Sequence, residues 1–142
     1  MIAFPLAPLL WAFEDFVYLN SSNPIEDWYN GECEEVQQSF DSLLKGIQKV
    51  DQHLNWVGWR GYLKGEAKES KIWEIGFKAR GKQYRIFGIF GSKKKHVILL
   101  VGCYHKQTIY TPPDAIATAI KRAKALAEGT GTTHARQINT DF

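Results

Sequence analysis

The sequence predicts a single α+β domain, in which a small antiparallel-rich sheet packs with two N-terminal helices and a C-terminal helix. Apolar residues recur every three to four positions near both ends of the chain, which predicts amphipathic helices. Between them, residues 72–104 form three β-prone runs separated by turn residues. With 142 residues, 44% of them hydrophobic, and only two cysteines, the chain is long enough to build one core without disulfides.

The N-terminal third is predicted to hold a short strand and two helices. Residues 16–19 are β-prone, and Asn23-Pro24 with Glu26 forms an N-cap, a first-turn proline and a capping box. Apolar residues at helical spacing predict a long helix over 33–54. Residues 55–71 contain three glycines without a clear period, so we expect a loop there that could be functional.

Residues 2–13 are an apolar leader broken by two prolines, and their place in the fold stays open. They lack the basic start and cleavage site of a signal peptide and are too short to span a membrane. We therefore expect a cytoplasmic protein with no membrane partner, in which Cys33 and Cys103 are reduced.

The second half of the chain is predicted to be a three-stranded meander followed by a helix. Residues 72–78 and 83–90 flank a four-residue turn, and the strongly apolar run 96–104 is expected to be a central strand covered on both faces. Residues 111–114 start the last helix with a cap and a proline, and Gly129 ends it. The buried stripe of this helix is predicted to be Ile116, Ile120, Ala123 and Ala127. We expect a core over about 14–127 and a polar, frayed tail over 129–142.

The first hairpin can be assigned face by face. If Lys78 pairs with Gln83, then Gly76 lies opposite Arg85 and Glu74 opposite Phe87. One face then packs on the helices and carries Trp73, Ile75, Phe77, Tyr84, Ile86 and Phe90. The other face carries a polar cluster of Glu74, Lys78, Gln83 and Arg85 beside Phe87.

The charge is distributed unevenly along the chain. Residues 1–55 carry 9 acidic and 2 basic side chains, whereas residues 56–106 carry 12 basic and 3 acidic ones. A basic block interleaved with aromatic residues is typical of a protein that binds a polyanion with stackable bases. The alternative is that the aromatic residues are core and the lysines only solubilise a sheet.

Arg85 is the first candidate for binding phosphate, because a guanidinium is always charged and matches two phosphate oxygens at once. An ion pair with Glu74 is the structural alternative. Lys78, Arg80 and Lys82 lie at the predicted hairpin tip, where they either bind a nucleic-acid backbone or are solvated turn residues.

His105, Lys106 and Tyr110 follow the central strand and are of types that transfer protons or stabilise charge near neutral pH. The alternative is an ordinary exposed connection. The four histidines and two cysteines have no ligand spacing, and phosphate-cradling or dinucleotide motifs are absent, so we expect no metal and no cofactor.

These residues together resemble a known family. The strings at 71–75 (Lys-Ile-Trp-Glu-Ile) and 83–87 (Gln-Tyr-Arg-Ile-Phe), followed by 104–108 (Tyr-His-Lys-Gln-Thr) and Thr111-Pro112, are similar to the HigB-type, phage-derived branch of the RelE/ParE toxin superfamily. The opening at 16–28 resembles that family as well. The resemblance covers about residues 14–127 and implies the RelE-like fold.

The resemblance also implies site residues. Arg85 would clamp the scissile phosphate, Lys106 would contact the phosphate or the leaving group, and Glu74 would act catalytically or support the arginine. Tyr104 would join the hairpin-tip cations in binding RNA. The chain departs from the family pattern at Gly76, Gln107 and Tyr110, where relatives often carry cations. We expect His105 and Tyr110 to substitute as proton carriers.

By this resemblance the protein is expected to be the toxin of a type II toxin–antitoxin pair, neutralised by a helix-turn-helix antitoxin. Its activity would be cleavage of translated mRNA, with the ribosome as a further partner, through attack of a ribose 2′-hydroxyl that needs neither metal nor cofactor. Two alternatives share the fold: a ParE-like gyrase inhibitor, and a catalytically inactive binding module of phage origin.

Overall fold

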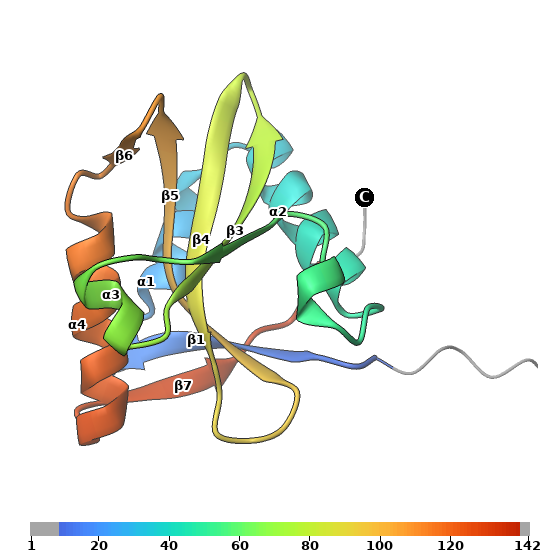
Figure 1. Cartoon of the computed structure of the whole chain (residues 1–142). Coiled ribbons are helices and arrows are strands. Elements are labelled where there is room, and N and C mark those ends of the chain that lie inside the picture. The colour runs from blue at the N-terminus through green and yellow to red at the C-terminus, as the bar shows by residue number, and fades with distance from the viewer. Residues whose placement is uncertain (1–8, 140–142) are drawn as a thin grey trace, which may run out of the picture.

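The computed structural model describes residues 9–139 and shows a mixed, mostly antiparallel sheet with helices on both faces (Figure 1). The strand order is β2-β3-β4-β5-β1-β7, and β6 pairs with β5. The elements are β1 (Ala12–Tyr18), α1 (Pro24–Gly31), α2 (Glu34–Ile47), the 3-10 helix η1 (His53–Asn55), β2 (Trp59–Tyr62), α3 (Glu66–Glu69), β3 (Trp73–Ala79), β4 (Lys82–Phe90), β5 (His96–Lys106), β6 (Ile109–Thr111), α4 (Ala115–Glu128) and β7 (Gly131–Ala135). The α+β class is confirmed, but the seven-stranded sheet is larger than predicted.

The central meander forms as predicted. Lys78 pairs with Gln83, Gly76 with Arg85 and Glu74 with Phe87. The turn is shorter than predicted, because Ala79 pairs with Lys82 and only Arg80 and Gly81 connect the strands. Both turn residues have positive φ, 52° and 71°, as a two-residue primed turn requires.

The strand β5 is central and is covered on both faces, which confirms the prediction. Val97 and Leu99 lie in the core cluster under α2, whereas Ile98 and Leu100 lie in the cluster under α4. In Figure 1, α3 and α4 lie on one side of the sheet and α2 lies on the other. The prediction packed helices on one face of the hairpin only. In the structure α4 also covers part of the second face, where Phe87 is fully buried.

The two N-terminal helices are present, but the second is shorter than predicted. In α1, the Asn23 side chain accepts a hydrogen bond from the Glu26 backbone N–H at 2.9 Å, which confirms the N-cap. The helix α2 ends at Ile47 rather than at residue 54. Beyond it, the Val50 carbonyl accepts hydrogen bonds from the indole N–H groups of Trp11 and Trp56, and Leu54 is 70% exposed. The backbone after Ile47 therefore turns to bond Trp11 and Trp56 instead of continuing the helix.

The last helix begins later than predicted. Its first residue is Ala115, and Thr111 belongs to β6 and is not a cap. Gly129 ends α4 with φ 77°, as expected for a left-handed C-cap. The buried positions are Ala115, Ala119, Ile120 and Ala123, while Ala127 is exposed.

Four strands or helices lie where no regular structure is predicted. The expected loop over 55–71 contains β2 and α3, the connection after residue 104 contains β6, and the expected frayed tail contains β7. The strand β1 starts at Ala12, inside the apolar leader, and Trp11 and Phe13 are part of the core. The part of that leader before residue 9 lies outside the described residues. Among the described residues, no helix has the length and apolar character needed to cross a membrane.

Candidate functional site

Four polar side chains gather on the α4 side of the sheet, near the end where β3 and β4 meet. Glu74 is on β3, Arg85 on β4, His105 on β5 and Tyr110 on β6. Their strands are neighbours, since β4 pairs with β3 and β5 and His105 pairs directly with Tyr110. Figure 1 shows that the upper ends of these strands extend past the first turn of α4. The helix therefore covers Phe87 but stops short of this end of the face.

The Arg85 side chain lies across the strand surface instead of reaching into solvent. Its side chain is only 9% exposed, Nη1 donates a hydrogen bond to the Tyr84 carbonyl at 2.9 Å, and Nε lies 4.0 Å from Glu74 Oε2. A Cβ added to Gly76 would lie 2.4 Å from Nη1. Gly76, where the family resemblance expects a cation, therefore provides the space that the guanidinium occupies. The predicted face for Arg85 is confirmed, but its burial was not expected.

A second guanidinium acts on this site. Burial, followed by the positive charge of Arg60, lowers the pKa of Arg85, while Glu74 opposes this shift. Arg60 is the extra residue of a β-bulge in β2, between Trp59, opposite Ile75, and Gly61, opposite Glu74. It is exposed. The site thus combines one exposed and one buried arginine with a single carboxylate.

Tyr110 is held as a hydrogen-bond donor. Its hydroxyl donates to Glu74 Oε2 at 3.0 Å, and its ring packs edge-on against Phe87 at 5.2 Å. Burial first, and then the Glu74 charge, raise the pKa of Tyr110 well above its usual value. The phenol therefore stays protonated at neutral pH, donates its one proton to Glu74 and cannot serve as a base.

His105 has the geometry of a base. Its Nδ1 lies 2.6 Å from the Gln107 carbonyl oxygen. Because a carbonyl oxygen only accepts, Nδ1 must carry the proton, so in the neutral ring Nε2 has a free lone pair. The ring is half-buried and lies 5.7 Å from the Tyr110 ring.

Cys103 also borders the site, on the strand next to Arg85. Its thiol contacts the Arg85 carbonyl at 3.5 Å, and burial raises its pKa to about 12. It therefore stays a neutral thiol and is not a nucleophile.

The remaining predicted site residues are spread around this cluster. Tyr104 contacts Tyr84 on the α2 side of the sheet, where Lys82 Nζ lies 4.5 Å from its ring centre. Strand alternation places Lys106 on that side as well, at the exposed start of the β5–β6 turn. Arg80 contacts Cys33 Sγ at 3.5 Å, and Lys78 is exposed beside Gly76.

Arg60 is the residue that the sequence reading missed, because it lies in the segment taken for a loop. The signal that could have identified it is the spacing of Trp59 and Tyr62 around Gly61, which is compatible with a short edge strand. Among residues 9–139, no group of three or more His, Cys, Asp or Glu side chains is placed to hold a metal ion.

Comparison with known families adds one result to this geometry. Residues 32–124 match the family model described as "Phage derived protein Gp49-like (DUF891)". The match covers well over half of the chain and contains every residue of the site described above. Comparisons with curated proteins and with solved structures give no match.

Proposed function

Because the chain belongs to the phage-derived Gp49-like family, we propose that it is the toxin of a type II toxin–antitoxin system and cleaves translated mRNA as a RelE/HigB-type interferase. The observation that carries this proposal is that neighbouring strands bring Arg85, Tyr110 and a histidine with a free Nε2 to one face, with Arg60 at the β2 bulge next to Glu74. A base beside clustered cations is what attack by a ribose 2′-hydroxyl on its own phosphate requires.

Each residue has a role in the proposed reaction. His105 Nε2 takes the proton from the 2′-hydroxyl, and the 2′-oxygen forms a bond to phosphorus. Arg85, with Arg60 beside it, stabilises the negative charge that develops on the phosphate oxygens. The bond from phosphorus to the 5′-oxygen breaks, and that oxygen takes a proton from solvent. Lys106, on the other face of the sheet, would bind flanking RNA together with the cations of the β3–β4 tip. The products are a 2′,3′-cyclic phosphate and a 5′-hydroxyl.

Glu74 acts as a positioning residue in this scheme. It accepts the Tyr110 hydrogen bond and lies 4.0 Å from the Arg85 Nε, so it orients both groups. The exposed cations Lys78, Arg80 and Lys82, with Tyr104, would bind the flanking RNA or the ribosome.

The partner of the toxin would be a helix-turn-helix antitoxin, and the pair would act in the cytoplasm. The first turns of α1 and α2 are acidic, with Glu26 and Asp27 in one and Glu34 and Glu35 in the other. These helices lie on the other face of the sheet from Arg85, although Arg80 at the hairpin tip contacts Cys33 at the start of α2. The helix face is therefore available for a protein partner and the Arg85 face for RNA.

The test is induced expression without the antitoxin, followed by mapping of RNA 5′ ends. The wild-type protein should give defined cuts in translated mRNA. Arg60→Ala and His105→Gln should each reduce cutting about a hundredfold or more, as removal of a charge-stabilising donor or of a base typically does. Arg60 is exposed, so its loss does not endanger the fold. Lys121→Ala, an exposed cation on α4, is the matched control and should cut normally.

Other results would identify a different function. Intact RNA together with trapped DNA breaks would indicate a gyrase inhibitor. Harmless expression with intact RNA would indicate an inactive binding module. Arg85→Ala should also abolish cutting, and circular dichroism must accompany it because that side chain is buried.

A further inference from the structure

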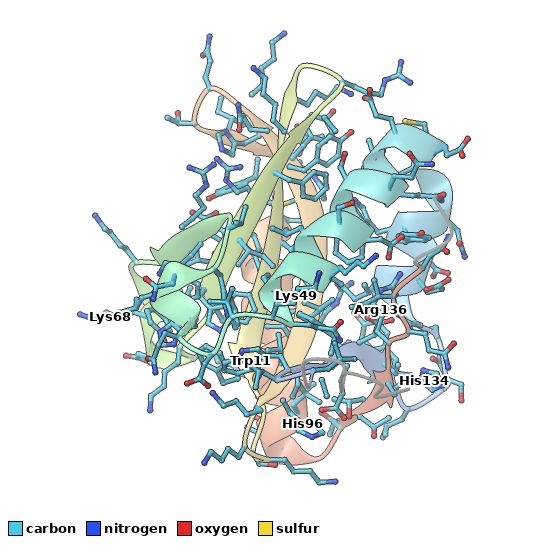
Figure 2. The ribbon with its side chains drawn as sticks, turned by 90° about the vertical axis from the view of Figure 1, so that its right-hand side faces the viewer. Trp11, Lys49, Lys68, His96, His134 and Arg136 are labelled. Carbon is cyan, nitrogen blue, oxygen red and sulfur yellow. The ribbon has the colours of Figure 1, made fainter. Side chains whose placement is uncertain are left out.

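The other end of β4 carries an aromatic-lined pocket that has no role in the proposed reaction. Its volume is about 520 Å³, and it is lined by Trp11, His53, Tyr62, Phe90 and the β4–β5 turn at 91–96. In Figure 1 this turn lies at the opposite end of the sheet from the β3–β4 tip, and in Figure 2 the labelled Trp11 and His96 mark its position. A pocket of this size lies within the range of small-ligand sites and can hold a planar heterocycle.

Trp11, His53 and Phe90 form the packed floor of the pocket, and Tyr62 is the exposed aromatic ring that lines it. The His53 ring lies 5.1 Å from Phe90 and 4.9 Å from Trp59, while Trp11 packs edge-on against the buried Trp56. Tyr62 packs against Trp59 at 5.7 Å but is 48% exposed. The floor is fully explained by packing, whereas the open face of Tyr62 is available for a ligand.

The rim of the pocket is positively charged. The turn provides Lys93, Lys94 and Lys95, and none of the described residues that line the pocket is acidic. Lys95 binds Asp51 and lies 4.6 Å from the Trp11 ring centre, so it belongs to the wall. Lys93 and Lys94 are exposed beside it. Two exposed ammonium groups next to an open aromatic ring match an anion that carries a planar group.

We propose that this pocket binds a base of single-stranded RNA, which stacks on Tyr62 while Lys93 and Lys94 contact the adjacent phosphates. Single-stranded nucleic acid is the ligand that would use both the aromatic ring and the lysines, because every base has a π-face and every phosphate is negatively charged. An acidic protein segment would satisfy the lysines but would leave the ring unused.

The pocket and the cleavage site are connected by the edge strand β2. Arg60 acts on Arg85 on one side of the sheet, and Tyr62, two residues later, lines the pocket on the other. A single RNA strand that crosses this edge would contact both places. The inference concerns binding, so it holds whether or not the other site cleaves RNA.

The test uses the purified full-length protein and a fluorescent single-stranded RNA of about eight nucleotides, with binding measured by anisotropy. A matched oligonucleotide without bases keeps the phosphates and removes the stacking. It should bind at least about fivefold more weakly. Tyr62→Ala should weaken binding of the natural RNA by a similar factor and leave binding of the abasic one unchanged. Tyr62→Phe keeps the ring and should bind as the wild type does.

A second pair of variants tests the phosphate contacts. Lys93→Gln with Lys94→Gln should weaken binding of both oligonucleotides and flatten its salt dependence. Lys64→Gln with Lys121→Gln removes the same charge beside α4 and should change neither. Arg60→Ala is the variant that tests cleavage. Adding Tyr62→Ala to it should weaken RNA binding further. The binding pocket can therefore be tested separately from the proposed reaction.

Three results would overturn the proposal. Equal binding of natural and abasic RNA would show that no base is held. Unchanged binding by Tyr62→Ala, with a folded protein by circular dichroism, would place the contact elsewhere. The third result is an acidic peptide that displaces the RNA and binds the wild type more tightly than Tyr62→Ala. That result would assign the pocket to a protein partner.

Discussion

At the scale of single residues, the site depends on a glycine as much as on an arginine. Gly76 is buried, and its missing side chain is replaced by the Arg85 guanidinium. The absence of a side chain at position 76 and the burial of Arg85 therefore go together. Arg60, from the neighbouring strand, brings a second positive charge to the same place.

Gly76→Ala should disturb this arrangement. The added Cβ would lie 2.4 Å from Arg85 Nη1 and 3.0 Å from the Tyr84 carbonyl oxygen, so the guanidinium must move. We expect a loss of about 1–3 kcal/mol in the free energy of unfolding, measured by urea denaturation, together with reduced RNA cutting. Gly46→Ala in α2 has nothing within 4 Å of the new Cβ and should stabilise the protein by about 0.5–1 kcal/mol. Equal stability of the two variants would contradict this packing.

Tyr84 gives a residue-scale prediction about alkaline pH. Burial, and then the Glu32 carboxylate, raise its pKa to about 12. Between pH 10 and 12 the unfolded chain loses the phenolic proton while the folded chain keeps it, so stability falls as the pH rises through this window. Each such group contributes at most about 1.4 kcal/mol per pH unit.

The measurement compares wild-type protein with Tyr84→Phe by urea denaturation at several pH values from 9 to 11. The variant should lose less stability over this range, because it has no phenol to titrate. Parallel curves for the two proteins would show that Tyr84 ionises as easily when folded as when unfolded.

The residues of the site were only partly predictable. Strand alternation was enough to put Arg85 opposite Gly76 and away from Tyr84, because hairpin register depends on local pattern. Its burial depends on what lies across the strand and could not be read locally. The hydrogen bond that sets the His105 tautomer depends on a turn at Gln107, whose φ is 60°, and no sequence pattern specified that turn.

At the scale of elements, the main surprise is the C-terminal strand. The strand β7 pairs with β1 from Glu14 to Tyr18, although its own sequence is polar. The C-terminal end of the sheet is held by Arg136, the residue directly after β7. Arg136 is almost fully buried and bonds Asp15 at 2.7 Å and Glu26 at 2.8 Å. Its guanidinium also lies over the rings of Tyr29 and Phe40.

Arg136→Leu should therefore be strongly destabilising. It leaves the buried Asp15 carboxylate without its cation, which typically costs about 3–5 kcal/mol. Burial already raises the pKa of Asp15, so the loss should be larger at pH 7, where the carboxylate must ionise, than near pH 4. Urea denaturation at the two pH values measures this difference.

A second substitution sharpens this test. Arg136→Leu combined with Asp15→Leu removes both charges and should recover part of the stability, since buried pairs are often replaceable by apolar residues. Gln137→Ala, at an exposed neighbour, is the control and should be neutral. No recovery in the double variant would show that the cost comes from packing and not from the unpaired charge.

The elements that the sequence predicted are those with a strong internal pattern. The β3–β4 hairpin follows from the alternation of side chains. The start of α1 follows from its N-cap, and the C-terminal end of α4 follows from its C-cap glycine. The strands β2 and β7 have no such pattern, because each is a short edge strand whose pairing depends on a distant partner. The overshoot of α2 has a similar cause: Val50 and Leu54 continue the helical period, but the indoles of Trp11 and Trp56 redirect the backbone.

At the scale of the whole molecule, the charge asymmetry of the chain becomes a division of surfaces. The acidic N-terminal part forms β1, α1 and α2, while the basic middle forms β2 to β5 and the turns at both ends of the sheet. Cations therefore gather at the β3–β4 tip near the proposed cleavage site and at the β4–β5 turn near the aromatic pocket. RNA that contacts both ends would cross the edge strand β2 and would be held largely by phosphate contacts.

This division leads to a prediction for the β3–β4 tip. Lys78, Arg80 and Lys82 are exposed there, and replacing all three by Gln should weaken RNA binding most at low salt. Each phosphate contact adds about 0.7 to the slope of log affinity against log salt for a single strand, so three contacts should reduce the slope by about 2. Anisotropy titrations at several salt concentrations measure it. Replacing Lys64, Lys121 and Lys124 by Gln removes the same charge beside α4, and a slope reduced equally in that variant would mean that net charge, and not the tip, binds the RNA.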